Sequence, residues 1–344
     1  MMGKPALFPE GTTIAVSIPG GLLNRLERHP EAEQARAEYR HLLRDCLTRH
    51  GVEGAESIMR KTTIGDTATE ALPWMGREEL VATCLVGAML LEADDLWERG
   101  EQAGRADARR CVEVARGEYA GPLPPFMRAF ADVYARYRPF WVAQGWEQAM
   151  TALGRWSDLM ATDPQVIEER ITDFEAYMAV RRIDFGFDTL DLLMRKSSSR
   201  LTPWEHPVPG TVSLFQDACC EYAILVNDLF SFPREHFSGE FRNALQVLVS
   251  VQEMSLQDAV DEVCRRIVTA ESNILALSRE NTEGSTGGDM RAWRAYHKSW
   301  MTFLAAGLRQ HLRDVRYHGA DHVWRGEIPT RITLYRDQSE FHYT

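Results

Sequence analysis

The chain has 344 residues, of which 44% are hydrophobic and 26% are charged, and its formal net charge is −11. This length and apolar content allow one large helical domain or two smaller ones. The acidic balance argues against nucleic acid or an anionic membrane surface as the main partner, so an anionic substrate would need local cations from arginine or a metal.

The cysteine pattern and the N-terminal sequence bear on the compartment. The 6 cysteines include no C-x-x-C pair and no histidine at zinc spacing, which predicts reduced core residues. No signal peptide is evident, and no run approaches the length of about 18 apolar residues that a membrane span needs. We therefore expect a cytoplasmic protein without stable membrane insertion.

In chain order, the prolines and glycines of residues 1–20 predict an extended strap. Beyond it, apolar residues recur near the helical period, and residues 63–73 favour a connector. The expected helical segments are 22–51, 77–98, 126–156, 166–182, 256–277 and 290–316, together with a helix that carries residues 227–235. Gly186, which follows the segment 166–182, suggests a break or kink in the helix. No segment shows the alternation of a strand, and the polar tail 318–344 is expected to be disordered or to act as a lid. These patterns predict an all-α fold.

Three oxygen-bearing side chains lie at steps of four in the stretch 227–235. On a helix, Asn227, Ser231 and Glu235 would share one face, each about one turn from the next. An amide oxygen, a hydroxyl and a carboxylate are hard ligands of the kind that Mg²⁺ prefers. An ordinary amphipathic helix would show the same spacing, so this motif alone leaves both interpretations open.

A second polar cluster ends the apolar segment 77–98. Asp94 and Glu98 are one turn apart, and Asp95 lies three residues before Glu98. The helix dipole disfavours carboxylates at the C-terminal end of a helix, so this placement favours a compensating cation. For a lone D-D-x-x-E motif, a solvated helix end is the alternative interpretation.

In combination, these two motifs and the pair Arg316-Tyr317 resemble the class I terpene synthases of the bacterial type, over roughly residues 80–317. The family carries an arginine 46 positions before the triad asparagine, and 227 − 46 gives Arg181. The family's Arg-Tyr pair follows the triad by about 80 residues, and here 316 − 235 is 81. The agreement of order and spacing is more specific than any single motif.

The resemblance implies a single all-α domain over 21–317, whose helices surround a deep apolar cavity. It implies Mg²⁺ ligands, three ions in all with Mn²⁺ as an alternative metal, at Asp94, Asp95, Glu98, Asn227, Ser231 and Glu235. It implies diphosphate binding by Arg181, Arg234, Arg316 and Tyr317. It implies catalytic roles for Arg181, Asp184, Phe185, Gly186, Arg316 and Tyr317, of which the first four match the family's sensor, linker and effector segment. The implied partner is an isoprenyl diphosphate, and a homodimer is an expected assembly.

The chemistry of such an enzyme explains these residue types. Ionisation of an allylic diphosphate separates an anion from a carbocation, so metal ions and arginines stabilise the developing charge. Apolar and aromatic walls would then exclude water from the cation. The substrate would be the C15 farnesyl diphosphate that is common in the family, or the C20 geranylgeranyl diphosphate, for which small residues such as Gly87 and Ala88 would leave room.

Two other functions compete with cyclisation. A chain-elongating prenyltransferase shares the fold and the metal chemistry, but it needs a second D-D-x-x-D motif where this chain has Asn227 and Ser231. A non-catalytic helical binding protein with vestigial motifs is the third hypothesis.

One local departure from the family pattern concerns Pro233, which is expected to kink the helix between Ser231 and Glu235 because proline lacks an N–H.

Overall fold

The computed structural model describes residues 7–61, 63–97, 102–197, 210–238, 241–279, 288–318 and 322–334. The chain divides into two compact units. Unit 1 comprises Met1–Arg25, Glu168–Phe185 and Trp204–Thr344, and unit 2 comprises Leu26–Ile167 and Gly186–Pro203. The expected all-α fold is confirmed, whereas the domain limits at 20 and 317 stay predictions.

Unit 2 is a group of helices around α4 (Arg77–Trp97), which packs against α1, α3 and α6. Its other helices are α1 (Ala32–Arg49), α2 (Ala55–Lys61), α3 (Ile64–Ala71), α5 (Gln102–Arg116), α6 (Pro125–Tyr137), α7 (Ala143–Met160) and α10 (Phe187–Lys196), with the 3-10 turn η2 (Arg138–Phe140). The apolar run of α4 is buried on several sides, and Trp97 ends it against Trp156, with ring centroids 5.3 Å apart. This packing fixes the position of the helix end that carries Asp94 and Asp95.

Unit 1 is organised around α11 (Thr211–Ser238), which packs against α9, α12, α13 and α14. Its other elements are β1 (Thr13–Ala15), η1 (Gly21–Arg25), α9 (Phe174–Asp184), α12 (Ala244–Ser250), α13 (Leu256–Arg279), α14 (Gly288–Arg313), α15 (Val315–His318) and β2 (Arg331–Thr333). Helix α8 (Pro164–Arg170) spans the point where the chain passes from unit 2 to unit 1. No helix among the described residues combines the length and the apolar character that a membrane crossing requires.

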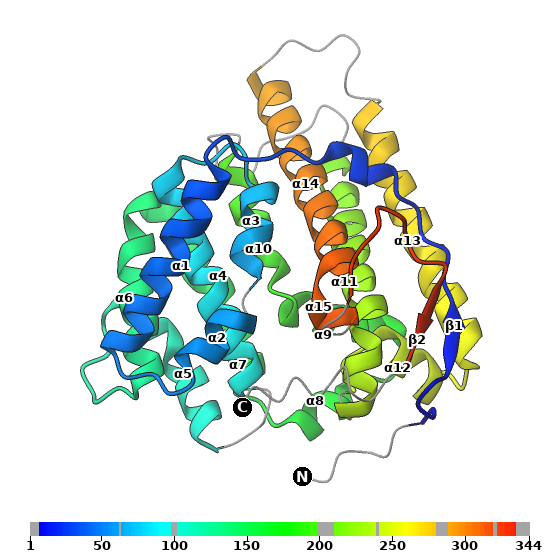
Figure 1. Cartoon of the computed structure of the whole chain (residues 1–344), viewed down its shortest axis with the longest axis horizontal. Coiled ribbons are helices and arrows are strands. Elements are labelled where there is room, and N and C mark those ends of the chain that lie inside the picture. Colours follow the sequence, from blue (N-terminus) through cyan, green and yellow to red (C-terminus); the bar gives the residue numbers. More distant parts are fainter. Residues whose placement is uncertain are drawn as a thin grey trace. The chain divides into compact units, whose positions relative to one another are not determined.

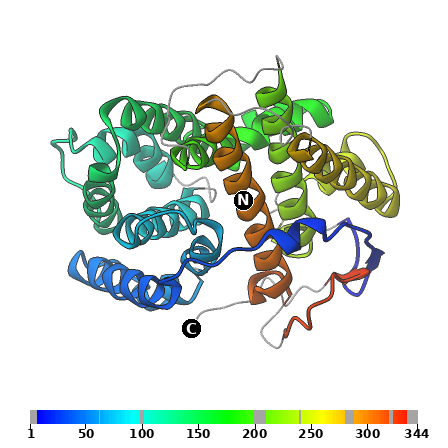
Figure 2. The ribbon, with the colours of Figure 1, turned by 90° about the horizontal axis from the view of Figure 1, so that it is seen from above.

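A short antiparallel sheet joins the two ends of the described chain. Strand β1, at the blue end of the colour scale, pairs with the red strand β2, and Ile14 faces Ile332 in the register (Figures 1 and 2). Both isoleucines are buried. The expectation of no strand was therefore wrong for these two segments, because three residues are too few to show an alternating pattern. One part of the polar tail thus pairs with the N-terminal strap.

Further boundaries differ from those expected. The segment 22–51 divides into η1 and α1, and the segment 126–156 divides into α6, η2 and α7. The connector over 63–73 contains helix α3. The helix expected over 166–182 is interrupted after α8, and α9 starts anew where the Asp173 Oδ1 accepts a hydrogen bond of 2.8 Å from the Ala176 N–H. Aspartate is a preferred N-cap residue because it satisfies an N–H that has no helical partner. The cap sets the start of the helix that carries Arg181.

Candidate active site

Helix α11 places the predicted triad on one of its faces, as the four-residue spacing predicted. Ser231 and Glu235 are buried and Asn227 is partly exposed, while Ile224 and Leu225 are fully buried in the core of unit 1. The helix continues through Pro233 to Ser238. The proline therefore does not end the helix, and all three side chains remain on one continuous element, while the expected kink stays a prediction.

Asn227 is held by residues from two other helices. Its Oδ1 accepts a hydrogen bond of 2.9 Å from Arg181 Nη2, and its Nδ2 lies 3.1 Å from His311 Nε2 on α14. The 46-residue spacing therefore does bring Arg181 to the triad asparagine. An amide oxygen has two lone pairs, so one remains for a second contact while Arg181 occupies the other.

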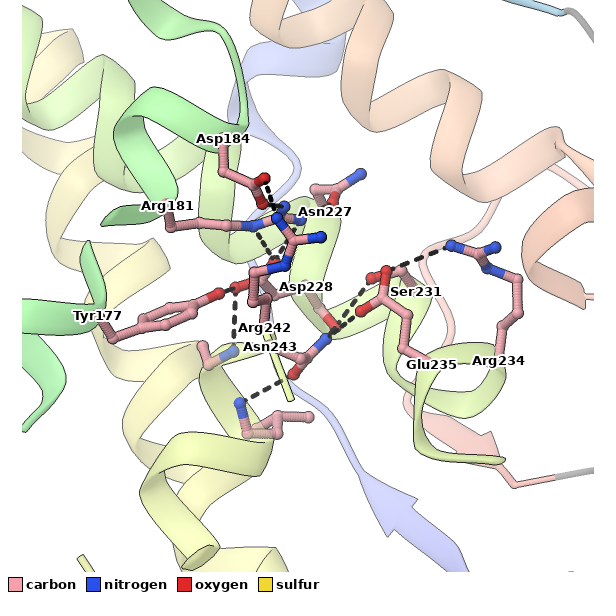
Figure 3. Close-up of polar contacts among 12 residues, drawn as sticks. Tyr177, Arg181, Asp184, Asn227, Asp228, Ser231, Arg234, Glu235, Arg242 and Asn243 are labelled. Atoms are coloured by element: carbon pink, nitrogen blue, oxygen red, sulfur yellow. Dashed lines mark hydrogen bonds and ion pairs between the residues drawn. The ribbon is translucent and has the colours of Figure 1, made fainter. Parts of the chain in front are cut away.

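Arg181 is the centre of a buried ionic network that also contains Asp228, Asp184 and Arg242 (Figure 3). Its Nη2 and Nε lie 3.1 and 3.2 Å from Asp228 Oδ1, and its Nη1 forms an ion pair with Asp184. Arg242 Nη1 lies 2.6 Å from the other oxygen of Asp184. Two cations thus face two carboxylates, which compensates the cost of burying each charge.

Burial acts on the pKa values of Asp228 and Arg181 in opposite directions. It raises the pKa of the Asp228 carboxyl to about 6, although the positive charge of Arg181 acts to lower it. Burial also acts to lower the pKa of Arg181, but the carboxylates of Asp228 and Asp184 outweigh it and hold that pKa well above its usual range. Arg181 therefore keeps its charge inside the protein.

Glu235 is oriented by Asn243, which lies at the start of α12 and is fully buried. Asn243 Nδ2 donates to Glu235 Oε2 at 2.8 Å and to the Asp228 carbonyl at 2.7 Å, while its Oδ1 caps α12 at the Leu245 N–H. Arg234 Nη2 lies 3.5 Å from Glu235 Oε1. These contacts fix one carboxylate oxygen of Glu235 in the core and leave the other beside Arg234.

The turn after Arg181 breaks the helix as the sequence predicted. Helix α9 ends at Asp184, Phe185 caps it, and Gly186 adopts a left-handed conformation with φ of 69° before α10 begins. Glycine reaches that conformation without the steric cost that other residues incur. The effector roles of Phe185 and Gly186 stay predictions.

The remaining predicted residues are Asp94, Asp95, Glu98, Arg316 and Tyr317. Asp94 and Asp95 occupy the last turn of α4 in unit 2, and both are partly exposed. Glu98 and the side chain of Arg316 lie outside the described residues. Tyr317 lies in α15, where its ring is 4.6 Å from the ring of His311.

The oxygen atoms that α11 offers as metal ligands fit a hard divalent cation. Asn227 Oδ1, Ser231 Oγ and a Glu235 oxygen follow one another along a single helix face, and only the last carries a charge. Ser231 donates a long hydrogen bond of 3.5 Å to the Asp228 carbonyl, which leaves the lone pairs of its oxygen available. Mg²⁺ is usually held by one or two carboxylates together with substrate phosphate, which agrees with this set.

Several residues of this site were not identified from the sequence, namely Tyr177, Asp228, Arg242, Asn243 and His311. Asp228 directly follows Asn227, so its place in the motif was the available signal. The Tyr177 hydroxyl donates to Asp228, but the two residues are 51 positions apart. Because such contacts depend on how helices pack, a single sequence gives no sign of them.

Comparisons with known proteins indicate the family and the fold of this chain. The family model "Terpene synthase family 2, C-terminal metal binding" matches residues 86–272, which is more than half of the chain. Among solved structures, germacradien-4-ol synthase from Streptomyces citricolor aligns with a TM-score of 0.63 and 16% identity, covering 86% of this chain and 97% of that one. Hedycaryol synthase in complex with nerolidol aligns with a TM-score of 0.62 and 19% identity, covering 88% and 99%. The fold is thus that of the class I terpene synthases.

Curated relatives give the same result at the level of sequence. An (E)-2-epi-beta-caryophyllene synthase of Selaginella moellendorffii is 29% identical over 66% of this chain, and the match spans 65% of that relative, just under two thirds of its length. A (2Z,6E)-hedycaryol synthase of Kitasatospora setae is 26% identical over 70% of this chain and 69% of the relative. Together with the family model, these matches show that the chain belongs to the terpene synthase family.

Proposed function

We propose that this protein is a Mg²⁺-dependent terpene cyclase that ionises a linear isoprenyl diphosphate, of C15 or C20 length, and cyclises the carbocation to a hydrocarbon or alcohol. The observation that carries the proposal is the direct contact between a buried, charged Arg181 and the triad residue Asn227. That contact puts a fixed cation beside a hard oxygen ligand, which is the combination that a metal-bound diphosphate needs.

The proposed metal ligands are Asn227, Ser231 and Glu235 on α11, and Asp94 on α4. We assign lesser roles to Asp95 and Glu98. Bound Mg²⁺, with Mn²⁺ as an alternative, would supply Lewis acid stabilisation of the leaving diphosphate. The number of ions, the apolar cavity, the cytoplasmic location and a homodimer stay predictions of the sequence.

Arg181 is the proposed anchor for the diphosphate. A guanidinium has five N–H groups, and the described contacts with Asp228, Asn227 and Asp184 use four of them. One Nη1–H is left for an anionic oxygen. Because the carboxylates hold the guanidinium in place, its charge needs little reorganisation when charge develops on the leaving group. Arg234, Arg316 and Tyr317 are proposed as further contacts of the diphosphate.

The competing functions differ in the substrates that they require and in whether they release diphosphate. A prenyltransferase would need a second isoprenyl diphosphate, and the amide of Asn227 and the hydroxyl of Ser231 stand where its second acidic motif would have carboxylates. A binding protein would release no diphosphate. The test is incubation of purified protein with Mg²⁺ and each of the C10, C15, C20 and C25 diphosphates, with and without isopentenyl diphosphate. Diphosphate release and gas chromatography of extracts are the readouts. A product from one substrate alone supports cyclisation, and release that requires isopentenyl diphosphate supports elongation.

The role of the acidic motif is tested by paired substitutions at the end of α4. Asp94→Asn is expected to lower the turnover rate by a factor of about 10² to 10³, as is common when one charge-stabilising group is lost. Asp95→Asn is the matched control, because it changes the neighbouring carboxylate, and a smaller loss is expected. Equal turnover in Asp94→Asn and the unmodified protein would remove Asp94 from the metal site.

A further inference from the structure

His311 on α14 is a buried histidine that the sequence motifs do not include, and 8% of it is exposed. Both of its ring nitrogens have partners. Nδ1 lies 2.7 Å from the Gly307 carbonyl oxygen, one helical turn earlier, and Nε2 lies 3.1 Å from Asn227 Nδ2 on α11. The imidazole therefore bridges its own helix and the helix that carries the triad.

The partners determine the tautomer of the ring. A carbonyl oxygen can only accept, so Nδ1 must carry the proton in the bond to Gly307. Because Asn227 Oδ1 accepts from Arg181, the amide presents its Nδ2–H to Nε2, which must therefore carry a lone pair to accept it. A backbone carbonyl commonly fixes a histidine tautomer in this way when the other nitrogen has a functional role.

The same logic determines which way the Asn227 amide points. With Nδ2 directed at His311, Oδ1 is directed at Arg181 Nη2, 2.9 Å away. A half-turn of the amide would place its NH₂ group against the guanidinium and its oxygen against the lone pair of His311. The first of these pairs would be two donors and the second would be two acceptors, so neither could form a hydrogen bond. Both neighbours therefore disfavour the flipped amide.

Aromatic contacts hold the imidazole plane itself. The ring of Phe230, on α11, lies 5.9 Å from the His311 ring, and the Tyr317 ring lies 4.6 Å from it. In addition, His318 Nε2 bonds the His311 carbonyl at 2.7 Å. The ring therefore cannot turn away from Asn227 without disturbing α11 and α15.

We propose that His311 is a positioning residue of the metal site, whose neutral imidazole holds the Asn227 amide with its oxygen directed to the ligand position. This inference rests on the proposed function, because it assumes that Asn227 Oδ1 binds Mg²⁺. His311 itself does not touch the metal or the substrate. It acts by fixing the orientation of a neutral ligand whose oxygen and nitrogen ends have similar shape, so that the oxygen end faces the cation.

The experiment measures metal affinity rather than turnover alone. Mn²⁺ is titrated into the full-length protein in the presence of inorganic diphosphate, and free Mn²⁺ is followed by electron paramagnetic resonance. His311→Phe keeps the ring and its aromatic contacts but loses both hydrogen bonds, and we expect it to weaken Mn²⁺ binding about 10-fold to 100-fold. His311→Gln, whose amide oxygen reaches the place of Nε2, is expected to restore binding to within about 3-fold of the unmodified protein, because one restored acceptor suffices to fix the amide.

Two further variants separate positioning from a general effect on the fold. His297→Phe is the matched control, since His297 is also a buried α14 histidine that bonds a carbonyl, at Ile274, and does not contact the triad. It is expected to bind Mn²⁺ as the unmodified protein does. In an Asn227→Ala background, His311→Phe should cause no additional loss, because the two residues act as one unit.

The outcomes distinguish the inference from the function on which it rests. Unchanged Mn²⁺ affinity in folded His311→Phe overturns the positioning role, whether or not the protein is a cyclase. If His311→Phe does not fold, His311→Asn replaces it, because asparagine reaches only the Nδ1 place, and equal affinity in the Gln and Asn variants then overturns the role. If the protein binds Mn²⁺ but releases no diphosphate from any isoprenyl substrate, the proposed function fails while the His311 effect remains measurable.

Discussion

Arg181 and Asp228 form an ion pair in the interior of unit 1, with Nη2 and Oδ1 3.1 Å apart and the side chains 12% and 0% exposed. The second oxygen of Asp228 accepts hydrogen bonds from the Tyr177 hydroxyl and from the Ala244 N–H, the latter at 3.0 Å. One carboxylate on α11 therefore ties α9 and α12 to the helix of the triad. Because a buried charge with several partners is costly to disturb, substitution of Asp228 tests whether this network stabilises the site.

Asp228→Asn should destabilise the protein by about 3 kcal/mol, because it removes a charge and leaves a buried network with one excess cation. The measurement is urea unfolding at neutral pH, followed by circular dichroism. Asp217→Asn is the control, since Asp217 is exposed and pairs with Arg182 at 3.5 Å, and a change below about 0.5 kcal/mol is expected there. Similar effects of both changes would contradict a structural role for the buried pair.

Arg181→Lys should weaken inhibition by inorganic diphosphate about 10-fold, because lysine keeps the charge but not the planar set of donors. Lysine is preferable to alanine here, since alanine would leave Asp228 and Asp184 without their shared cation. Arg182→Lys, on the partly exposed neighbour, should leave inhibition unchanged. A larger loss in the Arg182 variant would mean that the 46-residue spacing indicates the wrong arginine.

Gly186→Ala should cost about 1 to 2 kcal/mol of stability, because alanine is strained at a φ of 69°. A Cβ at this position would meet no atom within 4 Å, so the cost comes from the backbone alone. Gly154→Ala in α7 is a control with the opposite sign. Its Cβ would make an ordinary contact of 3.7 Å with Val112, and a helical alanine should be favourable by up to about 1 kcal/mol. Thermal unfolding of both variants measures the difference.

The stability of the protein should fall as the pH drops from about 6.5 to 4, in part through His297. Burial lowers the pKa of this imidazole from 6.5 to about 4, the bond to Ile274 opposes that shift, and the charge of Arg25 adds to it. The unfolded chain therefore binds more protons than the folded protein within this window, and each proton favours unfolding. Above about pH 6.5 the contribution of the neutral His297 ring to the stability of the fold is fully present.

His297→Phe isolates that contribution. Between pH 7 and pH 5, the unmodified protein should lose about 2 kcal/mol more stability than the variant. The reason is that the pKa of His297 is 6.5 in the unfolded chain and about 4 in the folded protein, so unfolding takes up one proton in this range. Denaturant unfolding at the two pH values gives the difference. Equal losses in the two proteins would show that His297 is not held neutral by burial.

The sequence by itself determined the helical character of the chain, the shared face of Asn227, Ser231 and Glu235, and the break at Gly186. Each of these follows from local rules, namely the 3.6-residue period and the conformational freedom of glycine. The family resemblance also selected Arg181, which lies 46 positions before Asn227. The structure shows a hydrogen bond between the two residues, while the diphosphate role of Arg181 stays a prediction.

Only the tertiary structure decided which residues hold those side chains in place. Asn243 reaches Glu235 from the start of α12, and His311 reaches Asn227 from a position 84 residues further along the chain. The pairing of β1 with β2 likewise joins segments more than 300 residues apart. No local pattern encodes such contacts, because they arise when packed helices and strands bring distant side chains within hydrogen-bond distance.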